Sequence, residues 1–415
     1  MFLGSFWIDG GDMRNLDLLR PPAGGRQAGA LQAVLAMLIT TLPLLSFAAL
    51  PPAMPRLVQH FAGAPRVTLL APMIATAPAV CIALLAPFAG ALAGYIGRRR
   101  LILWSLPLFL AAGLIPLAVD DIGLIIASRL IMGVADAALL TVGTTLIADY
   151  FSGDARRRWL AISGAASPLL TCLVTLIGGL LAELSWRGPF WVCLATAPVF
   201  VAAVLGLYEP GTAPPLPKGE GRDLAFAPGA LAVLSLATAA LAMLYYVAPI
   251  QIGLMLDGLG MKSPGRIALL SAAASVGYPI GAALFGRVGG RWPQKALASF
   301  ALSLFALGLI GMGLTSATLG IGLSAFVLQI GAGLALNLTI FQCFERSAYR
   351  WRALSTGVWV SSYFAGQFVS PLAVALLGSA AGGPRDGVAV LGVITAAAAV
   401  AGWAWPRRTA VLGAS

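Results

Sequence analysis

Two ionisable residues, Arg129 and Asp136, lie inside a long apolar segment that runs from about residue 122 to 148. A carboxyl group near the middle of a hydrocarbon layer costs roughly 2.5–3.5 kcal/mol on insertion scales, so such a residue usually has a function. Burial favours the neutral, protonated form of an aspartate, which suits a group that must gain and lose a proton. The same carboxyl could instead neutralise a cationic solute or join two helices through a hydrogen bond.

The spacing of these two residues limits how they can interact. Seven residues are two helical turns, so Arg129 and Asp136 would lie on nearly one face of a helix, about 10 Å apart along its axis. A bridging water, or a swing of the arginine, fits this spacing better than a static ion pair. Arg129 therefore has two possible roles, one in proton coupling and one as an anchor that extends toward the membrane surface.

Other kinds of site find little support in the sequence. His60 is the single histidine, which leaves no histidine cluster for a metal, and none of the three lysines (Lys218, Lys262 and Lys295) follows a glycine as a phosphate-binding loop requires. The net charge of +11 is dispersed in short loops rather than gathered in one patch. We therefore expect no enzymatic activity, no metal or other cofactor, no ATP and no nucleic-acid partner.

The elements that position Arg129 and Asp136 follow from the composition. Of the 415 residues 59% are hydrophobic and only 10% are charged, which is typical of an integral membrane protein. About 20 apolar residues cross the hydrocarbon layer as a helix. The sequence predicts twelve such helices, near residues 31–55, 68–90, 100–119, 122–148, 159–182, 189–208, 228–256, 266–285, 296–316, 318–343, 353–378 and 386–405.

Lysine and arginine give the orientation and the domain division. Most of them lie in the two tails and in the loops on the same side, so both termini are expected in the cytoplasm and the chain in the inner (plasma) membrane. A Pro- and Gly-rich stretch divides the helices six and six. We expect an N-terminal tail at 1–30, a six-helix bundle at 31–208, a cytoplasmic linker at 209–226, a second bundle at 227–406 and a C-terminal tail at 407–415. Translation could begin at Met1 or Met13.

Loop motifs recur in the two halves. "ALAGYIGRRR" at 91–100 aligns with "ALFGRVGGRW" at 283–292, and "RRWLAISG" at 157–164 aligns with "RWRALSTG" at 350–357 at almost the same separation. Paired halves of six helices are a transporter architecture. The repeat predicts two pseudo-symmetric six-helix bundles.

These loops resemble those of the major facilitator superfamily of secondary transporters, from about residue 31 to 405. In the loop "GALAGYIGRRR", Gly90, Gly97, Arg98 and Arg99 match the family's signature, whereas the position of its acidic residue is Gly94. In the family that acid helps to lock the two halves together on the cytoplasmic side. The resemblance therefore implies a cytoplasmic gating loop at these five residues, without the acid.

Two further motifs bear on the subfamily. Arg129 and Gly133 match a second motif of the family. The Gly-Pro pair that marks drug and metabolite antiporters is Val174 and Thr175 here, although the paired glycines that follow it are present. The resemblance thus identifies the superfamily and leaves the subfamily open.

The resemblance also implies a substrate cavity between the halves, for which polar and aromatic residues inside the helices are candidates: Tyr245, Tyr246, Gln251, Gln329, Asn337, Tyr363 and Gln367. Aromatic rings, amides and one acid suit an amphipathic or cationic organic solute. We expect a monomeric secondary transporter that exports such a compound in exchange for protons. The alternatives are a symporter or uniporter that imports an organic metabolite, and a non-transporting sensor on the same fold.

Overall fold

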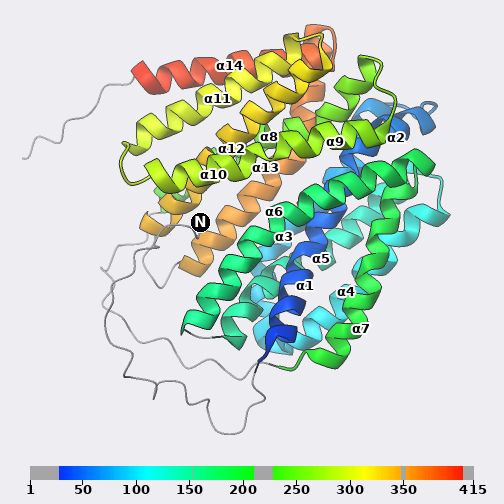
Figure 1. Ribbon diagram of the computed structural model, residues 1–415, viewed down its shortest axis with the longest axis vertical. Helices are drawn as coiled ribbons and strands as arrows, with labels where there is room; N and C mark the ends of the chain where they lie inside the picture. The colour runs from blue at the N-terminus through cyan, green and yellow to red at the C-terminus, as the bar shows by residue number, and fades with distance from the viewer. Residues whose placement is uncertain (1–27, 152, 210–227, 347–351, 405–415) are drawn as a thin grey trace, which may run out of the picture.

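The computed structural model describes residues 28–151, 153–209, 228–346 and 352–404, and these residues are almost entirely helical (Figure 1). The helices of the first half are α1 (Ala30–Ala49), η2 (Pro51–Ala53), α2 (Met54–His60), α3 (Val67–Ile96), α4 (Arg98–Ala118), α5 (Ile122–Tyr150), α6 (Gly153–Leu184), η3 (Gly188–Ala195) and α7 (Thr196–Gly206). Those of the second half are α8 (Pro228–Gly258), α9 (Pro264–Ser275), α10 (Gly277–Val288), α11 (Gln294–Leu314), α12 (Thr318–Arg346), α13 (Arg352–Ala381) and α14 (Pro384–Ala404).

In the described residues, 11 helices are long and apolar enough to cross a membrane. The count reaches 12 when Ala30–Leu45 and Phe47–His60, which meet at an angle of 43°, are taken as one bent span. A helix satisfies its own backbone hydrogen bonds, which is why long apolar segments adopt this form in lipid. The predicted all-helical membrane fold is confirmed. The predicted tails and linker fall mostly outside the described residues.

Short turns connect the helices, and the residue types in them explain where the helices end. Gly97 has a φ of +92° and joins α3 to α4 as a single residue, while Gly260 and Gly382 also adopt positive φ in turns. A residue without Cβ tolerates this conformation at little cost. Asp121 begins α5 by accepting a hydrogen bond from the main-chain N–H of Leu124 at 2.8 Å.

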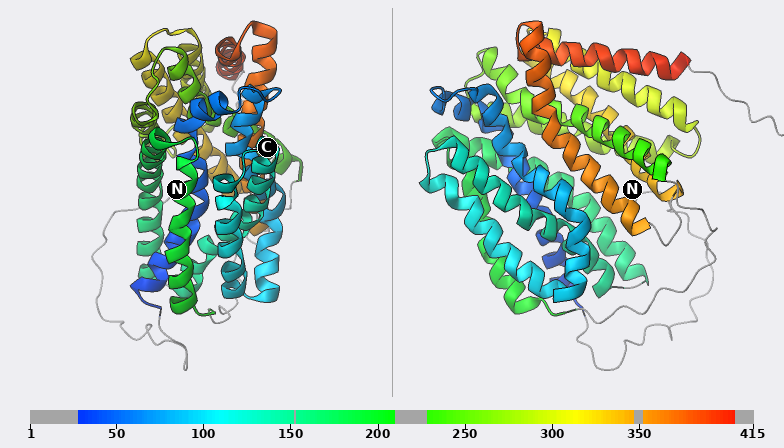
Figure 2. Two further views of the ribbon diagram at one scale, coloured as in Figure 1. Left: turned by 90° about the vertical axis from the view of Figure 1, so that its right-hand side faces the viewer. Right: turned by 180° about the vertical axis from the view of Figure 1, so that it is seen from behind.

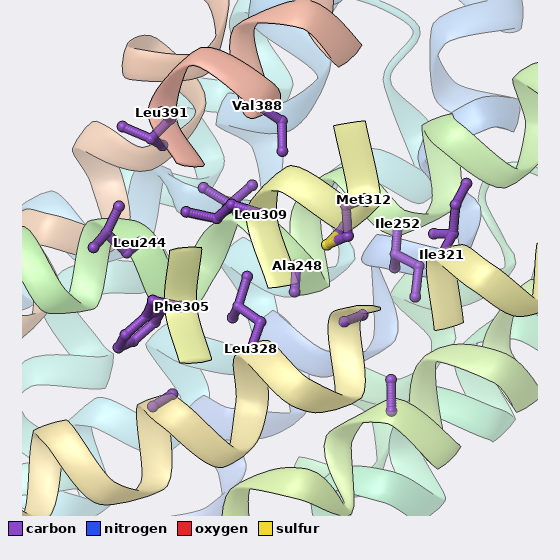
Figure 3. Packing of buried hydrophobic residues seen from close by; sticks show 14 of the residues in the cluster. Leu244, Ala248, Ile252, Phe305, Leu309, Met312, Ile321, Leu328, Val388 and Leu391 are labelled. Atoms are coloured by element: carbon purple, nitrogen blue, oxygen red, sulfur yellow. The ribbon is translucent and has the colours of Figure 1, made fainter. Parts of the chain in front are cut away.

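The helices form two bundles, coloured blue to green and green to red in Figure 1. In the first bundle α5 packs against α1, α3 and α4, and in the second α11 packs against α12 and α14 while α8 packs against α13. Each bundle has its own buried apolar core. Figure 3 shows part of the second core, in which Phe305 and Leu309 of α11 lie with Leu328 of α12 and with Val388 and Leu391 of α14.

The two bundles meet mainly through three sets of contacts. We call the side on which α7 ends and α8 begins the linker side, and the opposite side the distal side. α3 packs against α13 (Figure 2), α6 packs against α9, and η2 packs against α8 and α9. The η2 and α6–α9 contacts lie at the distal ends of these helices. In the described part of the chain α5 makes no more than isolated contacts with α12 or α13. The halves are therefore closed against each other on the distal side.

Candidate functional site

A cavity of about 150 Å³ lies where the two bundles meet. Its walls come from both halves: α1, η2 and α6 on one side, and α8, α9, α12 and α13 on the other. The polar and aromatic residues that line it are Phe47, Thr171, Thr175, Tyr245, Tyr246, Ser271, Ser275, Gln329 and Tyr363. Among the described residues, no charged side chain lines it. A site between the halves, accessible to a solute when they separate, is what a rocking-bundle transporter requires.

A cluster of aromatic rings forms one wall of this cavity. The hydroxyl oxygens of Tyr246 and Tyr363 are 3.1 Å apart and share a hydrogen bond. The ring of Tyr245 lies edge-on to that of Tyr246, with centroids 4.7 Å apart, and Trp359 stacks on Tyr363 with centroids 5.7 Å apart. The Trp359 N–H donates to the hydroxyl of Thr339 at 3.0 Å, which fixes the orientation of the indole ring. The rings therefore form a rigid surface on which a flat or cationic group can stack.

Four of the seven residues expected in the cavity line it, namely Tyr245, Tyr246, Gln329 and Tyr363. The other three are buried elsewhere. Asn337 donates its amide N–H to the carbonyl of Gly333 within its own helix at 2.7 Å. Gln251 and Gln367 are only 5% and 1% exposed and do not line the cavity.

Sequence reasoning named no residue of the first half as a candidate for this cavity, although α1 and α6 line it. Phe47 was one apolar residue among many in the first predicted helix. Thr171 and Thr175 on α6 each donate their hydroxyl to a carbonyl one turn earlier, a common arrangement of threonines in membrane helices. Their spacing of four residues puts them on one face, and that was the available signal.

Arg129 is 1% exposed and contacts α4 and η3. One guanidinium N–H group points at the sulfur of Met132 at 2.8 Å, and another reaches the carbonyl of Gly113 at 3.5 Å. The guanidinium lies 4.6 Å from the centre of the Phe190 ring, and its Nε atom has no hydrogen-bond partner in the described structure. These partners are weaker than a carboxylate, so the positive charge is incompletely compensated. The side chain of Arg129 is buried inside the first bundle.

Asp136 is fully buried, and within the described residues neither of its carboxyl oxygens has a hydrogen-bond partner. One turn earlier α5 approaches α3 closely, since a Cβ on Gly133 would lie 2.5 Å from the main-chain oxygen of Pro78. Arg129 does not form an ion pair with Asp136, and the expected separation of the two along one helix explains this. An ionised carboxylate without donors in an apolar environment is costly, and a neutral carboxyl fits these surroundings.

Asp136 does not line the cavity, but the next residue of α5 packs in a cluster that extends to the cavity wall. Its neighbour Ala137 belongs to a buried cluster with Ile82 of α3 and Phe364 of α13. Phe47 and Tyr363, which line the cavity, pack against this cluster. Ala137, the residue next to Asp136, is therefore linked to the cavity wall through buried apolar side chains.

The predicted gating loop forms a set of contacts within the first bundle. Arg98 forms an ion pair with Asp149 at the end of α5, and Arg99 donates to the carbonyls of Val204 and Leu207 at the end of α7, at 3.0 and 2.7 Å. The carboxylate of Glu209 accepts the main-chain N–H groups of Arg98 and Arg99 at 2.6 and 3.0 Å. The loop thus joins α4, α5 and the end of α7.

Two glycines of the predicted loop, Gly90 and Gly94, lie inside α3 rather than in a loop, since Gly97 alone separates α3 from α4. Gly90 lies near Thr141 of α5, whereas a Cβ on Gly94, the position of the family's acid, would have no heavy atom of the described structure within 4 Å. Gly94 therefore does not hold the second bundle.

Comparison with curated proteins finds relatives that are themselves transporters. "Efflux pump dotC" of Dothistroma septosporum is 31% identical over 109 residues, which are 26% of this chain and 19% of that protein. "Multidrug transporter protein MdtP" of Bacillus subtilis is 28% identical over 154 residues, 37% of this chain and 27% of that protein. The alignments span less than a third of either relative.

Solved structures of low sequence identity share the fold over nearly the whole chain. A bacterial homologue of the human lysosomal transporter Spinster, solved in an inward-facing and unoccupied conformation, matches with a TM-score of 0.73 at 15% identity, covering 91% of this chain and 97% of the other. The human organic anion transporter MFSD10 matches with a TM-score of 0.61 at 18% identity, covering 89% and 98%.

The family model described as "Major Facilitator Superfamily" matches residues 36–353, which is most of the chain. Together with two six-helix bundles around a central cavity, this match shows that the protein is an integral membrane transporter and that it belongs to the Major Facilitator Superfamily.

Proposed function

We propose that this transporter exports a small aromatic compound, uncharged or cationic, in exchange for protons, and that Asp136 is the group that carries the proton. Two observations together carry the proposal. Asp136 is fully buried and has no hydrogen-bond partner among the described residues, and the cavity between the halves is uncharged and lined by tyrosines. Export is supported by the two relatives that are described as an efflux pump and a multidrug transporter.

The cavity lining favours some solutes over others. It offers aromatic rings for stacking or for a cation, and hydroxyl and amide groups for hydrogen bonds, but no arginine, lysine or histidine to neutralise an anion. The cavity of about 150 Å³ is smaller than the 300–1,000 Å³ typical of drug-binding sites. A drug-sized solute therefore binds only after side chains rotate or the halves move apart.

The coupling step uses both buried charges. When Asp136 loses its proton, the new negative charge attracts the poorly compensated guanidinium of Arg129. If Arg129 swings toward it, the arginine leaves the carbonyl of Gly113 and the ring of Phe190, so the packing of α4 and η3 against α5 changes. The apolar cluster around Ala137 transmits that change to Phe47 and Tyr363 in the cavity wall. Protonation of Asp136 reverses the step.

The setting of the protein follows from the same reasoning. The excess of lysine and arginine on the linker side supports a cytoplasmic location for both termini in the inner membrane. We propose a monomer whose partners are the lipid bilayer, protons and the solute, without ATP or nucleic acid.

The test is proton release from purified protein in weakly buffered detergent solution. The probes are tetraphenylphosphonium as a lipophilic cation, an uncharged aromatic amide and an aromatic carboxylate, and the variants are wild type, Asp136→Asn and Asp121→Asn. Asp121 begins the same helix at the surface, and asparagine replaces aspartate well as a helix cap. The control therefore makes the same change of aspartate to asparagine and leaves the buried carboxyl group of Asp136 in place.

We expect the cation or the amide to release protons from wild type and from Asp121→Asn, but not from Asp136→Asn. Binding without proton release in wild type would contradict proton exchange and favour uniport or symport. Release that persists in Asp136→Asn would move the coupling role to another group. Binding of the carboxylate in preference to the other two probes would refute the proposed substrate class.

A further inference from the structure

Glu183, near the distal end of α6, contacts the other half of the molecule. Its carboxylate accepts a hydrogen bond from the main-chain N–H of Gly265 at 2.9 Å and another from the hydroxyl of Ser263. Both partners lie at the start of α9, where Ser263 is the N-cap residue. A carboxylate from the first bundle thus caps the N-terminus of a helix in the second bundle.

The charges around Glu183 favour this contact. The first N–H groups of a helix have no partner within the helix and carry a partial positive charge, so a carboxylate stabilises them. Pro264 has no N–H, which leaves Gly265 as the first free donor of α9. The positive charges of Arg56 on α2 and Arg266 on α9 act on the same carboxylate.

The contact of α6 with α9 continues from Glu183 toward the middle of the membrane. A Cβ placed on Gly179 would lie 2.2 Å from the Cβ of Ala268 and 2.8 Å from the main-chain oxygen of Pro264, so the two helices touch through their backbones there. Further inward, the thiol of Cys172 lies 3.8 Å from the carbonyl of Ala272. When the halves separate on the distal side, α6 must leave α9, and the hydrogen bonds of Glu183 must break.

We infer that Glu183 is a distal latch, a residue that sets the balance between the distal-closed and distal-open states of the transporter by capping α9 across the boundary of the two halves. This goes beyond the proposed function, because it concerns the two access states and holds whatever solute is carried.

Glu209, one of the acidic residues on the linker side, differs from Glu183 in one respect. Glu209 also caps a helix, α4, but that helix belongs to its own half, so its hydrogen bonds survive when the halves move. Gly94 supplies no acid there either. The hydrogen bonds of Glu209 and Asp121 to main-chain N–H groups stay within the first half, whereas the hydrogen bond of Glu183 joins the two halves. The latch therefore favours the arrangement that is closed on the distal side.

The experiment measures distances between spin labels by double electron–electron resonance in purified protein without any solute. The four cysteines are replaced, and labels are placed on exposed residues: Ala62→Cys with Ser316→Cys across the distal side, and Arg100→Cys with Arg291→Cys across the linker side. In this background we compare Glu183→Ala, Glu183→Gln and Ser263→Ala.

The matched control is Asp121→Ala. Asp121 also caps a helix on the distal side, but that helix lies in its own half. Loss of a helix cap changes an equilibrium by roughly 2- to 30-fold. We expect Glu183→Ala to raise the ratio of long to short distal distances by such a factor and to shorten the linker-side distance. Glu183→Gln and Ser263→Ala should shift the same ratio less far, and Asp121→Ala should not.

Unchanged distal distances in Glu183→Ala would overturn the latch, and so would an equal shift in Asp121→Ala. If Glu183→Ala does not fold, unchanged distances in both Glu183→Gln and Ser263→Ala overturn it as well. None of these outcomes depends on proton release, so the failure of the latch is distinct from failure of the proposed function.

Discussion

Replacing Gly179 by alanine should open the distal side of the molecule. The added methyl carbon would lie 2.2 Å from the Cβ of Ala268, whereas carbon atoms in contact are normally about 3.5–4.0 Å apart. Because the second close atom is the main-chain oxygen of Pro264, rotation of a side chain cannot relieve the overlap. α6 and α9 must separate by roughly 1.5 Å at this point, the difference between the two carbon–carbon distances.

Overpacking of this kind costs roughly 1–3 kcal/mol, and the cost falls on the distal-closed state alone, since α6 and α9 are apart in the open state. The ratio of distal-open to distal-closed molecules should therefore rise by roughly 5- to 150-fold in Gly179→Ala. The spin-label pair at Ala62 and Ser316 measures that ratio.

Two other glycines of α6 give matched controls for the same substitution. Apart from the backbone of its own helix, no described atom lies within 4 Å of the Cβ position at Gly164, so Gly164→Ala should leave the distances unchanged and stabilise the helix slightly. A Cβ on Gly178 would lie 2.3 Å from the main-chain oxygen of Ala49 in the same half, so Gly178→Ala should lower the unfolding temperature without a comparable change in the distal distance. A Gly179→Ala protein whose distance distribution matches that of Gly164→Ala would refute the reasoning.

Three further substitutions test the loop, the cavity and the pH dependence. Arg99→Ala removes two charge-assisted hydrogen bonds to the end of α7 and should lower the free energy of unfolding in detergent by roughly 1.5–3 kcal/mol. Arg100 is exposed, so Arg100→Ala should change the free energy of unfolding by less than about 0.5 kcal/mol. Equal effects of the two substitutions would contradict the assigned contacts. Tyr246→Phe should cost about 1 kcal/mol of unfolding free energy, and adding Tyr363→Phe should cost little more, because both remove the same hydrogen bond; fully additive costs would exclude it. Burial raises the pKa of Tyr150, which lies beyond the membrane span and donates to a main-chain carbonyl, to about 12. Its contribution to stability should be complete below about pH 10 and lost as the pH rises through about 12. The unfolding temperature of wild type should therefore fall more steeply over that range than the unfolding temperature of Tyr150→Phe, and identical slopes would contradict this.

Much of the fold could be predicted because the thickness and apolarity of the bilayer restrict which segments of a sequence can span it. Apolar segments of the right length must be helices, and the positions of glycines and charged residues in the loops mark their ends. Gly97 is an example, since a glycine followed by arginines marked the turn that the structure places between α3 and α4. The break between α9 and α10 was not visible in the sequence, because it depends on packing against neighbouring helices.

The candidate site was harder to predict, because a polar residue in a membrane helix has the same appearance whether it faces a cavity or a neighbouring helix. Tyr246 and Tyr363 face the cavity, but Asn337 bonds to its own backbone. The tertiary contacts that separate these cases, such as the hydroxyl pair of the two tyrosines, join residues more than a hundred positions apart. Glu183 was missed for the same reason, since its partner helix begins 80 residues later.

The central claim is that Asp136 couples solute movement to protons, and flux into liposomes tests it most directly. Purified wild type and Asp136→Asn would be reconstituted with tetraphenylphosphonium or the aromatic amide, and solute movement would be followed with and without an imposed pH gradient. Exchange of labelled for unlabelled solute at equal pH is the control for folding and binding. The account predicts that the gradient accelerates net flux in wild type only, while both proteins retain exchange. A gradient-driven flux in Asp136→Asn that equals that of wild type would contradict it.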